Sequence, residues 1–135
     1  MPLHFELVSP EKLVFSGDVQ QVDLPGAEGD FGVLEGHAPT VATLRPGILT
    51  VHAAGGAQQM VVLGGLAEVS ESGLTVLTEL ADTVADLDRT LLATRMTDLE
   101  QRIAKTDAGS ELDKLVTRLD HFKQIDRHLT GTAMH

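Results

Sequence analysis

The apolar residues of this chain change their spacing near Asp86, and this change limits what the chain can fold into. Over residues 3 to about 80 they recur at every second position in short runs separated by Gly, Pro, Ser or Asp, a pattern typical of antiparallel sheets. Beyond Asp86 they recur at helical spacing. We therefore predict an N-terminal antiparallel β-sandwich over residues 1–84 and a C-terminal antiparallel two-helix hairpin over residues 85–135.

Turn-forming residues indicate where the strands meet. Gly55-Gly56 and Ser72-Gly73 each separate two alternating runs and predict β-hairpins. Proline has no N–H to donate to a neighbouring strand, so Pro25, Pro39 and Pro46 should lie in turns or at sheet edges.

The first helix is predicted over residues 88–105. Leu92, Met96, Leu99 and Ile103 lie at positions i, i+4, i+7 and i+11 and so share one face of a helix. Residues 106–109, which end in a glycine, should interrupt it.

A second helix should start at residues 110–113, whose sequence Ser-Glu-Leu-Asp resembles a capping box. Gly131 is the expected stop. The apolar face of this helix contains Leu112, Leu115, Leu119, Phe122 and Leu129. These faces fit two interpretations, ordinary packing between two helices or a specialised interface. Because two short helices bury little apolar surface, the hairpin is a candidate moving part.

Charge is distributed unevenly along the chain. The first 84 residues contain eleven acidic residues and only two basic ones, Lys12 and Arg45, whereas the remainder contains nine acidic and eight basic residues. A net charge of -10 disfavours the basic surface that nucleic acids require. With no cysteine, the chain has no disulfide and no thiolate chemistry.

Membrane insertion and secretion are also not expected. No apolar run approaches the ~20 residues needed to cross a bilayer, so any membrane association should go through a protein partner. The N-terminus lacks the features of a signal peptide, and we expect a mature cytoplasmic start.

Residues that could support catalysis are scarce. The glycine-rich segment 26–32 carries two carboxylates and no lysine, which favours a tight loop over a phosphate site. No histidine pair has the i, i+4 spacing of a helical zinc site, and surface exposure is the simpler interpretation of the histidines. His37 could act as a base beside Asp30 or Glu35, or it could brace its loop. We expect no catalytic residue, metal or cofactor, and an interaction protein rather than an enzyme.

Several ordered motifs carry a resemblance to a known family. They are Val8-Ser9-Pro10-Glu11, Phe15-Ser16-Gly17, the segment 24–34 with the sequence LPGAEGDFGVL, Gly36-His37-Ala38-Pro39 and Arg45-Pro46-Gly47. In this order they resemble the epsilon subunit of bacterial F-type ATP synthases. The resemblance covers nearly the whole chain and is most specific in the first 80 residues.

The resemblance implies a fold, a role and partners. The family has a ten-stranded β-sandwich at the foot of the central stalk, where it packs against subunit gamma and the ring of c subunits, while catalysis belongs to subunits alpha and beta. It implies a non-catalytic rotor subunit at the cytoplasmic face of the bacterial inner membrane. The implied contacts with the c ring and gamma are Glu28, Gly29, Asp30, Phe31, Gly32 and His37, with both carboxylates facing c-ring arginines.

The resemblance also implies a regulatory role for the hairpin. In many relatives it either folds against the sandwich or extends to block ATP hydrolysis. Contacts with beta or gamma are then expected from Lys114, Arg118, Lys123 and Arg127, although these could equally be solvated helix charges.

Some relatives bind ATP through a pattern of Leu or Ile, Asp, two free positions and Arg-Ala. Here Leu87 and Asp88 match, but Leu91-Leu92 replaces Arg-Ala. We therefore interpret this nucleotide motif as vestigial.

Two rival hypotheses remain on the residues alone. A free-standing β-sandwich adaptor with a partner-binding hairpin would explain the composition but not the ordered motifs. A small hydrolase that depends on His37 would need a nucleophile or metal site that the sequence does not offer.

Overall fold

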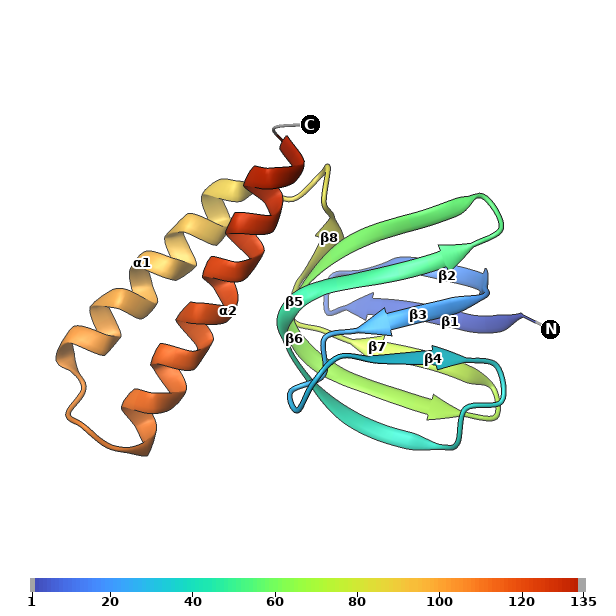
Figure 1. The fold of residues 1–135 in the computed structure, drawn as a ribbon, viewed down its shortest axis with the longest axis horizontal. Coiled ribbons are helices and arrows are strands. Elements are labelled where there is room, and N and C mark those ends of the chain that lie inside the picture. Colours follow the sequence, from blue (N-terminus) through green and yellow to red (C-terminus); the bar gives the residue numbers. More distant parts are fainter. Residues whose placement is uncertain (1, 134–135) are drawn as a thin grey trace. The chain divides into compact units, whose positions relative to one another are not determined.

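The computed structural model describes residues 2–133. The chain divides into two compact units, residues 1–86 and residues 87–135. The first unit contains eight strands, colored blue through yellow-green in Figure 1. They are β1 (Leu3–Ser9), β2 (Lys12–Val19), β3 (Gln21–Leu24), β4 (Phe31–Leu34), β5 (Thr40–Ala53), β6 (Gly56–Ser70), β7 (Gly73–Leu77) and β8 (Ala81–Thr83).

The strands form two layers because β5 and β6 are long and bend. The strand order is β2-β1-β7-β6-β5-β3-β4, with β8 also paired to β6. The N-terminal part of β5 and the C-terminal part of β6 lie with β7, β1 and β2 in the first layer. Their other halves lie with β3, β4 and β8 in the second (Figure 1). If β5 and β6 are each divided at the bend, the eight strands become the ten that the family resemblance implies.

One strand pair departs from the antiparallel prediction. β1 and β7 run parallel, with Phe5 opposite Leu74 and Val8 opposite Leu77, so the sheet is mixed. Hairpins force antiparallel pairing only between strands that follow one another, whereas β1 and β7 are separated by five other strands and are free to pair in parallel.

The core lies between the two layers. Every second residue of β1 points inward, and Phe5 and Leu7 are completely buried. The cluster is aliphatic apart from Phe5 and comprises Leu3, Phe5, Leu7, Val19, Val22, Leu24, Val33, Leu44, Leu49, Val51, Met60, Val62, Ala67, Val69, Leu74, Val76 and Ala81. The period-two prediction is thus confirmed.

The predicted hairpins form, but the predicted position of one proline is wrong. β5 and β6 are joined by residues 54–55, and β6 and β7 are joined by residues 71–72. Each turn lies one residue earlier than the predicted pairs, 55–56 and 72–73. Pro25 and Pro39 lie outside strands, whereas Pro46 lies inside β5, opposite Leu63.

Pro46 is tolerated because the ladder is interrupted at the bend. The register passes from Leu44 opposite Gly65 to Pro46 opposite Leu63. The Leu63 amide donates instead to the Leu80 carbonyl at 3.1 Å. Gly65 has φ +140, and a Cβ there would collide with the Leu77 carbonyl oxygen, so this bend requires glycine.

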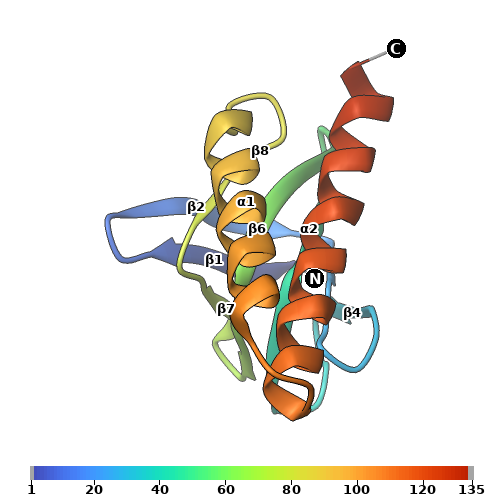
Figure 2. The same ribbon diagram turned by 90° about the vertical axis from the view of Figure 1, so that its left-hand side faces the viewer.

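The second unit is the predicted helical hairpin. Helices α1 (Arg89–Lys105) and α2 (Ser110–Ala133) run antiparallel, side by side (Figure 1 and Figure 2). Asp88 caps α1 by accepting from the Thr90 amide at 2.9 Å. The buried residues are Leu92, Leu99, Leu119, Phe122, Ile125 and Leu129; the predicted faces omitted Ile125.

The predicted start of α2 at Ser110 is confirmed, but its cap and its end need correction. Ser110 is its first helical residue, and the Asp113 amide donates to the Gly109 carbonyl at 3.1 Å. Gly109 therefore occupies the cap position. The helix also continues through Gly131 to Ala133, because glycine inside a helix costs only about 1 kcal/mol.

Candidate functional site

The loop between β3 and β4 is a compact turn built from its own backbone. The Gly29 amide donates to the Gly26 carbonyl at 3.1 Å, and the Ala27 amide donates to Thr43 of β5 at 2.8 Å. A Cβ at Gly26 would collide with the Gly29 carbonyl and the Phe31 ring. The glycine-rich segment thus encodes a tight turn, as predicted, and displays the side chain of Glu28.

Arg45 holds this loop from the neighbouring strand. Its guanidinium donates to the Gly26 carbonyl and to Asp30 Oδ1, each at 2.5 Å, and its amide donates to the Pro25 carbonyl at 2.9 Å. The Arg45 side chain is 23% exposed and that of Asp30 is 74% exposed. Asp30 therefore already has a cationic partner within the chain.

Glu28 differs from Asp30 in this respect. It is exposed at the tip of the turn, and no ion pair or hydrogen bond from residues 2–133 reaches its side chain. Of the two predicted carboxylates, Glu28 is the one left available to an outside cation.

The other residues predicted for this site have structural roles too. Phe31 is half-buried and packs against the core, and Gly32 lies opposite Asp23. His37 is exposed, and its Nδ1 hydrogen-bonds the Ala38 carbonyl at 2.7 Å. The prediction that His37 braces its loop is therefore confirmed, and Arg45 rather than His37 pairs with Asp30.

A groove runs beside the loop. Its volume is about 650 Å³, and its walls are residues 26–29, Phe31 and residues 40–43 of β5. Val41, in this wall, is 65% exposed.

An apolar row crosses the outer face of the first layer. Strand register aligns Leu66 of β6 with Leu77 of β7, Leu77 with Val8 of β1, and Val8 with Leu13 of β2. Leu13, Leu66 and Leu77 are 56%, 39% and 50% exposed. We call Leu13, Val8, Leu77 and Leu66 the outer row. Outward apolar residues aligned across four strands are unusual for a surface facing only water.

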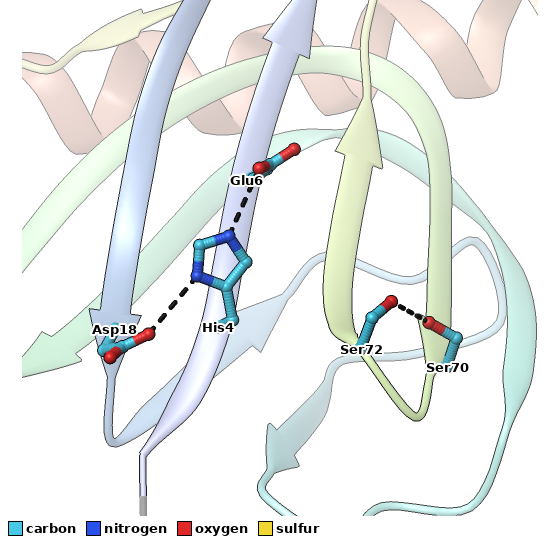
Figure 3. Close-up of polar contacts among 5 residues, drawn as sticks. All are labelled: His4, Glu6, Asp18, Ser70 and Ser72. Carbon is cyan, nitrogen blue, oxygen red and sulfur yellow. Dashed lines mark hydrogen bonds and ion pairs between the residues drawn. The ribbon is translucent and has the colours of Figure 1, made fainter.

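The adjacent rows on this face carry acid. His4 of β1 lies between Glu6 and Asp18, at 3.2 and 3.3 Å (Figure 3). These hydrogen bonds, first with Glu6 and then with Asp18, raise the pKa of His4 above its ordinary value. Ser70 and Ser72 form a further polar pair, 2.8 Å apart, at the turn between β6 and β7 (Figure 3).

A second histidine pair lies on the second layer. His52 Nε2 is 2.7 Å from Asp23 Oδ2, and Gln21 donates to Asp23 Oδ1 at 2.6 Å. Hydrogen bonding with His52 lowers the pKa of Asp23, and burial opposes it. Sequence reasoning missed this pair because the partners are 29 residues apart and meet only through the pairing of β3 with β5.

The hairpin residues singled out from the sequence do not converge on one site. Lys114, Lys123 and Arg127 are exposed, and Arg118 lies over the Phe122 ring at 5.4 Å from its centroid. Of the two residues that match the nucleotide pattern, Leu87 is half-buried and Asp88 caps α1. At the Arg-Ala positions, Leu91 is half-buried and Leu92 is buried.

Arg89, next to the cap, fastens the open end of the hairpin. Its Nη2 donates to Asp126 Oδ1 at 3.1 Å and to Thr130 Oγ1 at 2.9 Å on α2. We call these three residues the clasp.

Within residues 2–133, no three His, Asp or Glu side chains are grouped so that they could hold a metal ion. No helix in the same range is long and apolar enough to cross a membrane.

Comparison with known proteins agrees with the geometry. The family described as "ATP synthase, Delta/Epsilon chain, beta-sandwich domain" matches residues 2–84. Curated relatives match over 132 residues, which is 98% of this chain and 97% of each relative. The "ATP synthase epsilon chain" of Afipia carboxidovorans is 58% identical, and that of Nitrobacter winogradskyi is 61% identical.

A solved structure is similar over the same span. A chain of the Euglena gracilis mitochondrial ATP synthase, determined by cryo-electron microscopy as OSCP/F1/c-ring, superimposes with a TM-score of 0.71 at 26% identity. The match covers 99% of this chain and 82% of that one. The two-layered sandwich, the helical hairpin and the sequence similarity all point to the same family. This chain belongs to the ATP synthase epsilon chain family.

Proposed function

We propose that this chain is a non-catalytic rotor subunit of an F-type ATP synthase, in which the sandwich couples rotation of the c ring to the catalytic head. The catalytic sites then lie on subunits alpha and beta. Family membership over nearly the full length supports this role. The free-standing adaptor hypothesis accounts for the two units but not for this similarity.

The outer row is the observation that carries the proposal. A sandwich acting alone gains nothing by exposing Leu66, Leu77 and Leu13 in register, whereas burying them against another subunit is favourable by about 25 cal/mol per Å². Subunit gamma is the proposed occupant of this face. Acidic side chains beside the row, including Glu6 and Glu68, would give the contact a preferred orientation.

The acidic loop is proposed to face the c ring. Glu28 supplies the free carboxylate, and Asp30, held by Arg45, fixes the turn that displays it. Charge pairs of this kind contribute to register and rate of association more than to affinity. Gly29, Phe31 and Gly32 lie at the same end of β4 as this loop, whereas His37 lies in the loop beyond the other end of β4.

The hairpin is proposed as a regulatory element. Lys114, Lys123 and Arg127 are exposed on α2, and in an extended state they and Arg118 could pair with acidic residues of alpha, beta or gamma. Such a switch needs two packings that differ by only a few kcal/mol. We place the chain at the cytoplasmic face of the bacterial membrane, attached through its protein partners.

The outer row can be tested directly. Changing Leu66 and Leu77 together to Ser should leave the sandwich folded, because both side chains are at least 39% exposed, but should lower recovery of gamma with the tagged chain by about tenfold or more. Val116→Ser, 48% exposed on α2, is the matched control and should recover gamma normally. Normal recovery by the double variant would contradict the proposed interface.

A further inference from the structure

The N-terminal part of β5 is an open sheet edge. Residues 40–43 pair with β6 on one side only, since β3 joins β5 further along, at residues 50–52. In Figure 1 this part of β5 is the lowest ribbon of the sandwich, at the edge of the first layer. Among the residues that the structure describes, the only pairing on its other side is the short bridge between Gly26 and Leu44.

The backbone groups at this edge can be assigned from the bridge. The Thr43 carbonyl accepts from Ala27, and the Arg45 amide donates to Pro25, so Thr43 and Arg45 direct their backbone groups away from β6. The backbone N–H and C=O groups of successive residues point to alternate sides of a strand. Val41, two residues before Thr43, must therefore present both its N–H and its C=O at this edge. In the described part of the chain, no loop hydrogen bond reaches Val41 or the Thr43 amide.

The groove of about 650 Å³ lies along this same edge. One of its walls is the strand itself, and the exposed Val41 side chain and the free Glu28 carboxylate border it. Unpaired N–H and C=O groups beside a groove suit an extended backbone, which can satisfy both kinds of group at once. Neither a helix nor a rigid small molecule offers that alternation.

We infer that this edge takes up an extended segment of a neighbouring stalk subunit as an additional β-strand, in antiparallel or parallel pairing with residues 40–43. The segment should carry an apolar side chain near Val41, which is exposed beside this edge. This inference rests on the proposed function. A second copy of the chain is a poorer occupant, because each copy carries a net charge of -10 and would repel the other.

Replacing Val41 with proline tests backbone pairing separately from side-chain contact. Because the Val41 N–H faces away from β6, Val41→Pro removes no bond of the free sandwich, and edge strands tolerate such a proline. Added to an ATP synthase depleted of this subunit, Val41→Pro should bind at least ~10-fold more weakly, whereas Val41→Ala, which keeps the N–H, should stay within about threefold. Equal binding by the two variants would overturn the inference.

Amide hydrogen exchange tests the same edge without any substitution. In the free chain the Val41 and Thr43 amides should exchange rapidly, and in the reconstituted complex they should be protected at least ~100-fold. Glu28→Lys should slow association, most at low salt.

The outcomes distinguish this inference from the proposed function. Entry into the complex with both amides still unprotected would overturn the added strand alone. Failure of the unaltered chain to enter the complex would overturn the proposed function. Protection that increases with concentration of the free chain would instead identify a second copy as the occupant and contradict the inference.

Discussion

The sandwich and the hairpin differ in how far apart in the sequence their contacts are formed. The sandwich core brings together seventeen buried residues spread from Leu3 to Ala81, and its first and seventh strands pair directly. Up to residue 130, where burial is described, the hairpin has six buried residues on two consecutive helices, and one clasp at its open end. Contacts between distant segments make a unit that unfolds as a whole, whereas a small local unit can open separately.

This difference suggests a division of work. A surface that transmits torque should belong to the unit that does not open, and the outer row, the acidic loop and the open edge of β5 all lie on the sandwich. A switch should belong to the unit whose two states differ least in free energy. The hairpin suits that proposed role better than the sandwich does, because fewer buried residues hold it together.

The largest expected effect compares two buried phenylalanines. Phe5→Ala in the sandwich and Phe122→Ala in the hairpin each remove a ring that is at most 1% exposed. Phe5→Ala should cost about 3–5 kcal/mol of the free energy of unfolding and should shift the urea midpoint of the whole sandwich.

Phe122→Ala should instead increase amide exchange within α1 and α2 and leave the β-strand amides protected. If Phe122→Ala exposed the β-strand amides as much as Phe5→Ala, the two units would not be energetically separable.

A smaller effect concerns the clasp. Arg89 and Asp126 are 48% and 44% exposed, so Arg89→Ala should destabilise the closed hairpin by no more than about 1 kcal/mol. Faster hydrogen exchange of the backbone amides near Leu129 would measure this loss of stability. Arg102→Ala is the matched control, because its pair with Asp98 lies within α1 and should not affect α2. Additive effects of Arg89→Ala and Asp126→Ala would show that the two side chains do not act together.

The smallest effect is a pH dependence confined to the sandwich. The His52 hydrogen bond lowers the pKa of Asp23 below its ordinary 3.8. The ionised Asp23 carboxylate, hydrogen-bonded to His52, therefore stabilises the fold above pH 3.8. This stabilisation is lost as the pH falls through the lowered pKa of Asp23 in the folded state. Since both side chains are more than a third exposed, the loss should be below about 1 kcal/mol. Urea unfolding between pH 2 and 6 should show it in the unaltered chain and not in Asp23→Asn.

The local parts of the fold could be predicted from the sequence. Period-two runs, the helical faces and the turn glycines each depend on neighbours a few residues away, and the strands and helices lie where these patterns indicate. The parallel pairing of β1 with β7 depends on the whole topology. Pro46 was misplaced for the same reason, since a proline inside a strand is acceptable only where the ladder breaks, and the break comes from Leu63 and Gly65 on another strand.

The candidate site shows the same limit. The sequence indicated that Glu28 and Asp30 belong to one tight loop. It did not reveal that Arg45, fifteen residues beyond Asp30, neutralises one of the two. The outer row was equally hidden, because Leu13 and Leu66 become neighbours in a row only through the register of β1, β7 and β6.

Removal of the hairpin tests the division of work most directly. A chain ending at Val84 should fold, assemble with an ATP synthase depleted of this subunit, and support ATP-driven proton pumping as the full chain does, because the proposed coupling surfaces all lie on the sandwich. Its folding is checked first by exchange protection of the β-strand amides. If the truncated chain folds and assembles but supports no proton pumping, the hairpin is required for coupling and the account is contradicted.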